Sequence, residues 1–221
     1  MSGVLDGKVV AVVGASGCHG AAVARTLGRE GASLVLGARS REPLQELQRE
    51  LESYETRVLV VGTDVTRQRH LERLVEVALE SLGALDALVY AARARPSSLE
   101  SLEAGAWGES VDVNVRGFLY SVGAALPAML ERGGGHVVDL DAGAGDGALD
   151  RAGARIRLEV LEELYSRFSN GGLFVSQVRA CESSPERDAG EVLRALSEPF
   201  GGQPDGSFPQ SGARGERGTE L

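Results

Sequence analysis

The sequence predicts a single α/β domain built on a doubly wound parallel sheet with helices on both faces. Short runs rich in valine and leucine alternate with longer segments of helical period, as expected for strand–helix–strand units. The short runs are almost wholly apolar, so we expect each strand to be buried on both faces. A length of 221 residues is enough for a single sizeable core.

The first half of the chain contains four expected strands and three expected helices. The run KVVAVV ends at a glycine cluster, as the first strand of such a fold does, and the second helix carries Leu44, Leu47 and Leu51 on one face. The strands are expected at residues 8–13, 33–36, 57–61 and 85–90, and the helices at 21–30, 42–54 and 67–82.

The second half continues the alternation and ends in a polar tail. A long helical region is expected at 99–131, strands at 136–140 and 173–178, and helices at 152–168 and 186–196. From Gly201 onward the sequence is rich in glycine, serine and proline and has no apolar period. We therefore expect one domain over residues 1–200 and a disordered tail over residues 201–221.

The charge balance and the hydropathy pattern exclude several classes of function. Acidic residues outnumber basic residues by 32 to 23, giving a net charge of −9. Nucleic acid and anionic membranes are therefore not expected as partners, because binding them needs a basic surface. No run approaches the roughly 20 apolar residues of a membrane-spanning helix, and the start of the chain lacks a secretory pattern. A cytoplasmic protein is expected.

Cysteines and histidines do not predict a metal site. Cys18 and Cys181 are too few and too far apart for a CxxC pair or a disulfide framework. The three histidines, at positions 19, 70 and 136, show no HxxxH or HExxH spacing. No metal is expected.

The glycine cluster after the first expected strand is the strongest functional signal in the chain. Gly14, Ser16, Gly17 and Gly20 lie between a strand and a helix. Glycines there permit a tight turn and let backbone N–H groups approach a pyrophosphate at the positive end of the helix. The alternative is a strand–helix turn whose glycines only allow close packing.

The end of the second expected strand indicates which dinucleotide is bound. A chain that prefers NAD usually carries an acid here for the ribose 2′-hydroxyl, whereas this chain has Arg39. A guanidinium can bind a 2′-phosphate through two hydrogen bonds, which favours NADP. The alternative is that Arg39 is a solvated surface arginine.

Several segments, in order and at matching spacing over residues 4–199, resemble the short-chain dehydrogenase/reductase family. The resemblance implies a Rossmann-like fold and an NADP(H)-dependent oxidoreduction. It also implies that Asp64, in the segment with Val65, holds the adenine ring, and that Asn114 is the family's structural and catalytic asparagine. The similar segments are LDGKVVAVVGASGCHG, GARSREPLQEL, Asp64-Val65-Thr66, DVNVRGFLYSVGAALPAML, GGGHVVDLDAGAG and DAGEVLRALSEP.

The catalytic positions depart from that family. Ala142 stands where the family has its serine, Arg151 where it has its tyrosine and Arg155 where it has its lysine. No tyrosine in the chain has a lysine four residues later, because the only lysine is Lys8. Hydride transfer to a carbonyl leaves an alkoxide that an acid must protonate. An arginine cannot serve as this acid, because its pKa is above about 12 and it does not release its proton near neutral pH. We therefore expect no independent turnover.

The cofactor and substrate regions also differ from the family pattern. Cys18 replaces the middle glycine of the loop, and Tyr90-Ala91-Ala92-Arg93 replaces the family's NNAG run. Only residues 182–187 precede the last expected helix, so the substrate lid is expected to be short. Asp139 and Asp141 are expected to point to opposite faces, which would exclude an acid pair, and Asp141 is expected to pair with Arg151.

The resemblance suggests that this chain is a non-catalytic subunit. Members of the family pair through the helices expected here at residues 99–131 and 151–168. The favoured hypothesis is a heterotetramer with a catalytically intact paralogue, which interconverts β-hydroxy and β-keto forms of a substrate with NADP(H). The substrate that the resemblance implies is bound to a carrier protein. The shortened reductase-like subunit of novobiocin-type aminocoumarin antibiotic pathways is similar in length, in its use of arginine and in its missing dyad.

Two other classes of function remain open from the sequence. The chain could be a non-redox enzyme of the same fold, a cyclase or dehydratase, that uses Arg151 and Arg155 to bind an oxyanion. It could also be an NADP(H)-sensing binding protein without catalytic activity.

Overall fold

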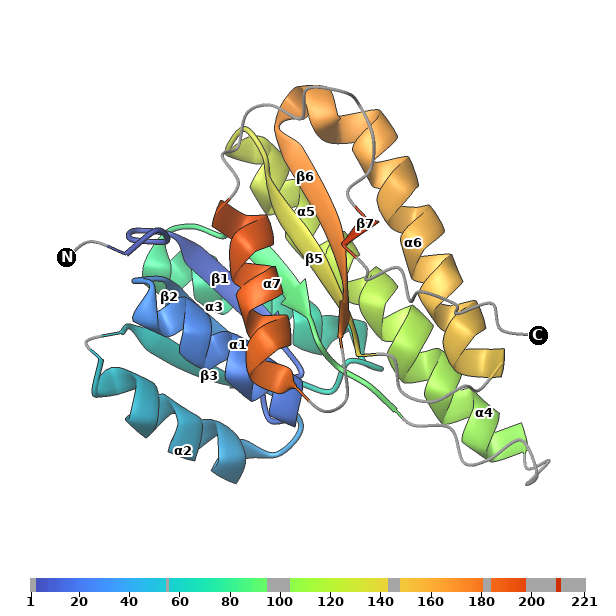
Figure 1. Ribbon diagram of the computed structural model, residues 1–221, viewed down its shortest axis with the longest axis horizontal. Coiled ribbons are helices and arrows are strands. Elements are labelled where there is room, and N and C mark those ends of the chain that lie inside the picture. Colours follow the sequence, from blue (N-terminus) through green and yellow to red (C-terminus); the bar gives the residue numbers. More distant parts are fainter. Residues whose placement is uncertain are drawn as a thin grey trace, which may run out of the picture.

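A seven-stranded parallel sheet forms the centre of the computed structural model (Figure 1). The structure describes residues 3–54, 56–94, 104–142, 148–180, 184–197 and 210–211. The order β3-β2-β1-β4-β5-β6-β7 runs outward from β1 in both directions, and every pair of neighbouring strands is parallel. The doubly wound sheet predicted from the sequence is confirmed. The strands are β1 (Val9–Val13), β2 (Ser33–Ala38), β3 (Val58–Gly62), β4 (Ala87–Tyr90), β5 (Gly135–Ala142), β6 (Leu173–Ala180) and β7 (Gln210–Ser211).

Helices cover both faces of this sheet and bury two apolar layers against it. One layer joins the sheet to the first, second and last helices, and the other joins it to the helices between them. On one face lie α1 (Cys18–Arg29), α2 (Arg41–Glu52) and α7 (Pro185–Ser197). On the other lie α3 (Gln68–Leu82), α5 (Phe118–Glu131) and α6 (Ala148–Phe168).

The central strand β1 shows why so continuous an apolar run is needed. All five of its residues are buried, and their side chains alternate between the two layers. Val10 and Val12 pack with α1 and α2, whereas Val9, Ala11 and Val13 pack with α3 and α5. A polar residue at any of these positions would be buried without water on either face.

The expected long helix at 99–131 differs from a uniform α-helix. Its described part consists of α4 (Ala104–Val111), a π-helical segment (Asp112–Gly117) and α5, while residues 99–103 lie outside the described residues. A π-helical segment accommodates an extra residue in the helix, and such segments are frequent at functional sites. It contains Asn114, whose side chain binds backbone outside the helix.

Several strands and helices extend beyond the limits expected from apolar runs. β5 and β6 continue to Ala142 and Ala180, past the charged residues Asp141 and Arg179, and α6 begins at Ala148. Apolar residues become sparse at these ends of the strands, whereas backbone pairing between β5 and β6 continues through Asp141 and Arg179. A 3-10 turn (Ser169–Gly171) follows α6.

The expected disorder of residues 201–221 is wrong for Gln210 and Ser211. These two residues form β7 and pair with Gln177 and Val178 of β6. Without them, β6 would present unpaired backbone groups along its outer side, and such an edge readily accepts another strand. The remainder of the expected tail lies outside the described residues.

One helix of the described chain is long and apolar enough to cross a membrane, contrary to the expectation from the sequence. It covers the 25 residues Trp107–Glu131. Its inner residues Phe118, Ala125 and Met129 are fully buried against the sheet, and the core helix of a globular domain passes the same test of length and composition.

The connection from β6 to the last helix is short, as expected. β6 ends at Ala180 and α7 begins at Pro185, and residues 181–183 of this connection lie outside the described residues. A long substrate-covering insertion therefore has no room between these two elements.

His136 makes the stability of this fold depend on pH. Its ring is buried between β5 and β6, with Nε2 2.9 Å from the Ser176 hydroxyl, and burial lowers its pKa to about 4. Between pH 6.5 and pH 4 the unfolded chain therefore takes up a proton that the folded chain does not. We expect the free energy of unfolding to fall by roughly 3 kcal/mol over this range from this residue alone.

Urea unfolding at a series of pH values measures this dependence. The variant His136→Gln should lose this part of the pH dependence, since the other ionisable groups are unchanged. Equal slopes for the two proteins between pH 6.5 and pH 4 would contradict the prediction.

Candidate functional site

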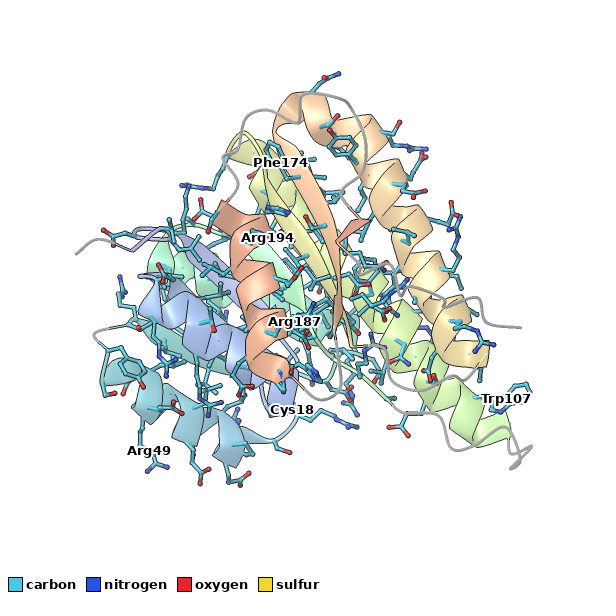
Figure 2. All side chains as sticks on the ribbon, viewed as in Figure 1. Cys18, Arg49, Trp107, Phe174, Arg187 and Arg194 are labelled. Atoms are coloured by element: carbon cyan, nitrogen blue, oxygen red, sulfur yellow. The ribbon has the colours of Figure 1, made fainter. Side chains whose placement is uncertain are left out.

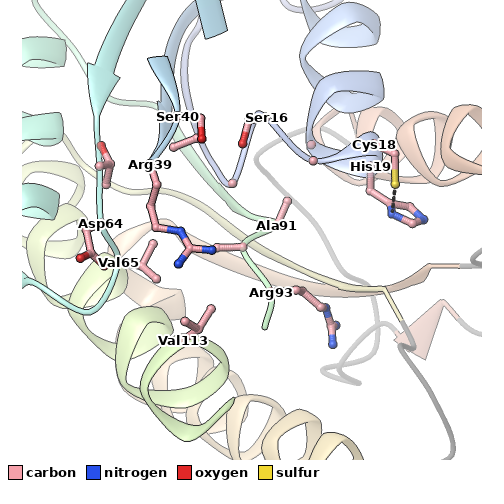
Figure 3. Close-up of a pocket in the computed structure, with 16 residues that line it drawn as sticks. Ser16, Cys18, His19, Arg39, Ser40, Asp64, Val65, Ala91, Arg93 and Val113 are labelled. Carbon is pink, nitrogen blue, oxygen red and sulfur yellow. Dashed lines mark hydrogen bonds between the residues drawn. The ribbon is translucent and has the colours of Figure 1, made fainter. Parts of the chain in front are cut away.

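A cleft lies at the carboxyl ends of β1, β2, β3 and β4, where the strand order reverses (Figure 3). Ligands of open α/β sheets bind at this reversal point. The cleft brings together every cofactor-binding residue expected from the sequence. Its lining includes Gly14, Ser16, Gly17, Gly20, Arg39, Asp64 and Val65.

The glycines of the loop after β1 are required by close backbone contacts. Gly14 has a φ of 89°, and a Cβ there would lie 2.4 Å from the backbone nitrogen of Ala92. A Cβ at Gly20 would lie 2.3 Å from the carbonyl oxygen of Gly14. Gly17 precedes α1, whose first turn has no side-chain cap and no acidic residue. The loop can therefore present backbone N–H groups to an anion at the positive end of α1.

Arg39 extends from the end of β2 across the cleft (Figure 3). Its side chain is 68% exposed, and a guanidinium nitrogen lies 3.7 Å from a carboxylate oxygen of Glu109 on α4, which is also exposed. Exposed pairs of this kind contribute at most about 1 kcal/mol. The guanidinium is therefore available to a competing anion.

Asp64 is a hydrogen-bond acceptor at the end of β3. Its Oδ1 accepts hydrogen bonds from the backbone N–H and the hydroxyl of Thr66, at 3.0 and 2.8 Å. Burial raises the pKa of Asp64, but these bonds and the charge of Arg67 bring it below its ordinary value. Asp64 is thus ionised near neutral pH. Val65, next to it, is buried beneath the cleft.

Asn114 joins the π-helical segment to the chain that leaves β4. Its amide oxygen accepts from the Ala94 N–H at 3.0 Å, and its amide nitrogen donates to the Ala94 carbonyl at 2.9 Å. The amide nitrogen also donates to the Ser110 hydroxyl at 3.1 Å. The side chain thereby holds one wall of the site in place.

Tyr90 is a structural side chain within this wall. Its hydroxyl donates to the carbonyl of Val113, and a Cβ at Gly117 would lie 2.6 Å from its oxygen. Burial raises the pKa of Tyr90 well above its ordinary value. The phenol therefore stays protonated and cannot exchange a proton near neutral pH.

Two of the three expected replacements of the family's catalytic residues lie outside the cleft. Arg151 and Arg155 are both exposed on α6, and Arg155 pairs with Glu159 at 2.6 Å. Neither arginine lines the cleft. Ala142 ends β5, and its side chain lies outside the described residues.

A different arginine, Arg157, is buried next to the cleft, where it contacts Asn114. Its side chain is 2% exposed. Its Nε donates to Asp139 at 2.8 Å, and its two terminal nitrogens donate to Asp141 at 2.8 Å and to the Asn114 carbonyl at 3.0 Å. Arg93, after β4, also pairs with Asp141. We call these four charged side chains the β5–α6 ion network; their formal charges cancel.

The network corrects two expectations. Asp139 and Asp141 point to the same face of β5, because residues two apart along a strand share a face. Asp141 pairs with Arg157 and Arg93, where the sequence predicted Arg151. Burial lowers the pKa of Arg157, but the two carboxylates raise it above its ordinary value, so the guanidinium remains charged.

Arg157 was not among the residues predicted from the sequence, although the sequence contains a signal for it. Leu161 is fully buried and lies one helical turn after Arg157, so this arginine falls on the face that covers the sheet. Asp139 interrupts an apolar strand in the same way. Buried charges are almost always paired. An arginine on a buried helix face together with an aspartate in a buried strand therefore predicts an ion pair between them.

The described residues contain no group of three or more histidine, cysteine or acidic side chains that could hold a metal ion. The arrangement that they do contain is a parallel sheet with a glycine-rich loop and an anion-accepting helix end at its reversal point. These features define a dinucleotide-binding α/β protein.

The comparisons identify the family. The family model for short chain dehydrogenases matches residues 8–153, more than half of the chain, so this protein belongs to the short-chain dehydrogenase family. It is 36% identical to glycine betaine reductase ATRR of Emericella nidulans over 212 residues, which is 91% of this chain and 17% of that protein. It is 38% identical over 138 residues to an uncharacterized oxidoreductase of Staphylococcus aureus strain MW2, 62% of this chain and 59% of that protein.

Solved structures of the family share this fold. A metagenomic short-chain oxidoreductase in complex with NADP matches with a TM-score of 0.80 and 25% identity, over 89% of this chain and 93% of that one. A short-chain type dehydrogenase/reductase from Mycobacterium ulcerans matches with a TM-score of 0.80 and 21% identity, over 88% of this chain and 84% of that one. The match covers 17% of the length of ATRR and 59% of that of the Staphylococcus aureus oxidoreductase, less than two thirds in each case.

Removing the central guanidinium should strongly destabilise the fold. Arg157→Ala leaves two carboxylates buried without their main partner, and breaking a buried pair costs about 3–5 kcal/mol. We expect urea denaturation to show a loss of this size. The control Arg155→Ala, two residues away on the exposed side of α6, should change stability by less than about 0.5 kcal/mol. Similar losses for the two variants would contradict a special role of Arg157.

Proposed function

We propose that this protein is a short-chain dehydrogenase subunit that binds NADP(H) but lacks its own proton-transfer dyad. It acts with a catalytically intact paralogue in the cytoplasm. The observation that carries the proposal is the β5–α6 ion network, because the charged groups between β5, α6 and Asn114 are paired with one another and offer no proton-transfer dyad.

None of the described tyrosines has a neighbouring lysine that could lower its pKa for proton transfer. The only lysine, Lys8, lies at the amino end of β1, 3.6 Å from Asp86 and at the opposite edge of the sheet from the cleft. Tyr90 is nearest to the network and is held protonated by burial. A positioned acid contributes about 10²–10⁴-fold to the rate, so its loss supports a non-catalytic role.

The residues of the cleft fit NADP(H). Gly14 and Gly20 permit the close backbone contacts of the loop after β1, and the first turn of α1 offers N–H groups to a pyrophosphate. Arg39 would bind the 2′-phosphate and the ionised Asp64 the adenine amino group. When bound, the nicotinamide supplies or accepts the hydride. The metagenomic relative of known structure is described as a complex with NADP.

The outer surface of α6 supports a protein partner. An apolar groove there is lined by Ile156, Val160, Leu164 and Phe168 and bordered by Glu159, Glu163 and Arg167. Trp107, Val111 and Leu119 are exposed on the neighbouring α4 and α5 (Figures 1 and 2). The family resemblance assigns these helices to pairing between subunits, so the proposed occupant is the corresponding helix pair of the intact paralogue.

The proposed reaction of the complex is the interconversion of β-hydroxy and β-keto groups on a carrier-protein-bound substrate. The proposed setting is antibiotic biosynthesis of the aminocoumarin type, in a heterotetramer of two subunits of each kind. Arg151 and Arg155 do not line the cleft, so nothing in the geometry favours the alternative of an oxyanion-binding cyclase or dehydratase.

Arg39 should determine which dinucleotide is preferred. A charge-assisted hydrogen bond contributes about 1.5–3 kcal/mol, so Arg39→Ala should weaken NADPH binding by about 10–100-fold. Binding of NADH should change little. Titration calorimetry measures both, and Arg49→Ala, an exposed arginine of α2 (Figure 2), is the control. A wild-type protein that binds NADH as tightly as NADPH would contradict the assignment.

The isolated chain should not turn over alcohol or ketone substrates. Co-expression with an intact paralogue should give a stable complex on a sizing column, and Ile156→Asp in the groove of α6 should separate its components. Arg194→Ala on α7, on the other side of the sheet (Figure 2), should leave the complex intact. Turnover by the isolated chain, or separation of the wild-type pair, would contradict the proposal.

A further inference from the structure

Three side chains at the mouth of the cleft form a second cluster, which the proposed function does not use. Cys18 is the first residue of α1, and its Sγ lies 3.2 Å from Nδ1 of His19 (Figure 3). Nε2 of His19 lies 3.4 Å from Oδ2 of Asp188, on α7. Cys18 is a free, exposed thiol, whereas the side chain of Asp188 is almost fully buried.

The arrangement matches that of an activated nucleophile. In such sites a thiol lies within hydrogen-bond distance of a base, and a third group orients the base. A carboxylate only accepts hydrogen bonds, so Asp188 favours the histidine tautomer with its proton on Nε2. Nδ1 of His19 is then left with its lone pair directed at the Cys18 thiol. The protein places these groups in the order thiol, base, carboxylate.

The fold, and not only the sequence, creates this cluster. Cys18 and His19 are neighbours in the chain, but Asp188 is contributed by α7, which packs beside α1 on the same face of the sheet (Figure 1). Both Cys18 and His19 line the cleft, so small molecules in solution can reach the sulfur. A negative charge on that sulfur would lie at the N-terminal turn of α1, where the helix dipole stabilises it.

We propose that Cys18 is a reversible oxidation site for hydroperoxides. The thiol sulfur attacks one peroxide oxygen, an S–O bond forms and the O–O bond breaks. The sulfur loses two electrons and the peroxide is reduced, so that Cys–SH and ROOH give Cys–SOH and ROH. His19 takes the thiol proton and returns it to the departing oxygen. Two molecules of a small thiol reverse the change, giving Cys–SH, a disulfide and water.

Oxidation also changes the nucleotide cleft, and this part of the inference rests on the proposed binding of NADP(H). The new oxygen would lie at the same N-terminal turn of α1 that offers N–H groups to the pyrophosphate. A sulfenic acid, or the mixed disulfide that follows from it, would therefore compete with the dinucleotide. The chain would lose its cofactor under oxidising conditions and regain it on reduction.

The test measures hydrogen peroxide oxidation in a Cys181→Ser background, which leaves Cys18 as the only cysteine. Dimedone trapping and mass spectrometry of the intact protein give the rate. We expect His19→Asn to slow oxidation by roughly 10²-fold, the lower end of what a positioned base contributes. Asp188→Asn should also slow it. Arg187→Ala, an exposed neighbour on α7 (Figure 2), should have no effect.

Two results would overturn the oxidation site. One is a Cys18 that reacts no faster than free glutathione at the same pH, and the other is an unchanged rate in His19→Asn. Because Asp188 is buried, circular dichroism is used to check that Asp188→Asn folds. If Asp188→Asn does not fold, the oxidation rate of His19→Asn alone tests the proposal.

A second measurement separates this inference from the proposed function. Oxidised protein should bind NADPH at least about tenfold more weakly than reduced protein, a difference of about 1.4 kcal/mol, and glutathione should restore binding. Equal affinities would overturn the competition. A reduced protein that does not bind NADPH at all would overturn the proposed function, while the oxidation rates would still decide the thiol site.

Discussion

The structure depends most on one buried guanidinium. Arg157 is held by two carboxylates of β5 and by a backbone carbonyl of the π-helical segment, so it connects a strand, a helix and the wall of the cleft. Taking such charges out of water costs several kcal/mol for each ion, and that cost is offset only when every partner is in place. The positions of β5, α6 and Asn114 are therefore coupled, because moving any one of them would leave a buried charge without its partner.

This coupling gives the two sides of the cleft different characters. Over β1, β2 and β3 the site has a glycine loop, an uncapped helix end and an exposed arginine, all of which suit an anionic nucleotide. Over β4 and β5 the charged groups already satisfy one another. The protein thus has features that suit a dinucleotide on one side, while the charged groups on the other side form a neutral set of ion pairs.

The helix α6 contributes to both the core and the surface. Its inner face carries Arg157 and Leu161 against the sheet, and its outer face carries the apolar groove lined by Ile156 and Leu164. Because the inner face is fixed by the ion network, the outer face is presented in a defined orientation. A rigid helix surface of this kind is what a protein partner needs, because little side-chain or backbone freedom is then lost on binding.

Sequence alone predicts the doubly wound sheet and the loop of Gly14 and Gly20, and it shows that no tyrosine has a lysine four residues later. These follow from local signals: apolar runs bury strands, glycines permit close backbone contacts, and a missing residue type needs no coordinates. By contrast, the folded chain was needed to find that Arg157 donates a hydrogen bond to the Asn114 carbonyl and that Asp188 lies next to His19. Such contacts join residues far apart in the chain, and their geometry is set by how helices pack on the sheet, which no local pattern encodes.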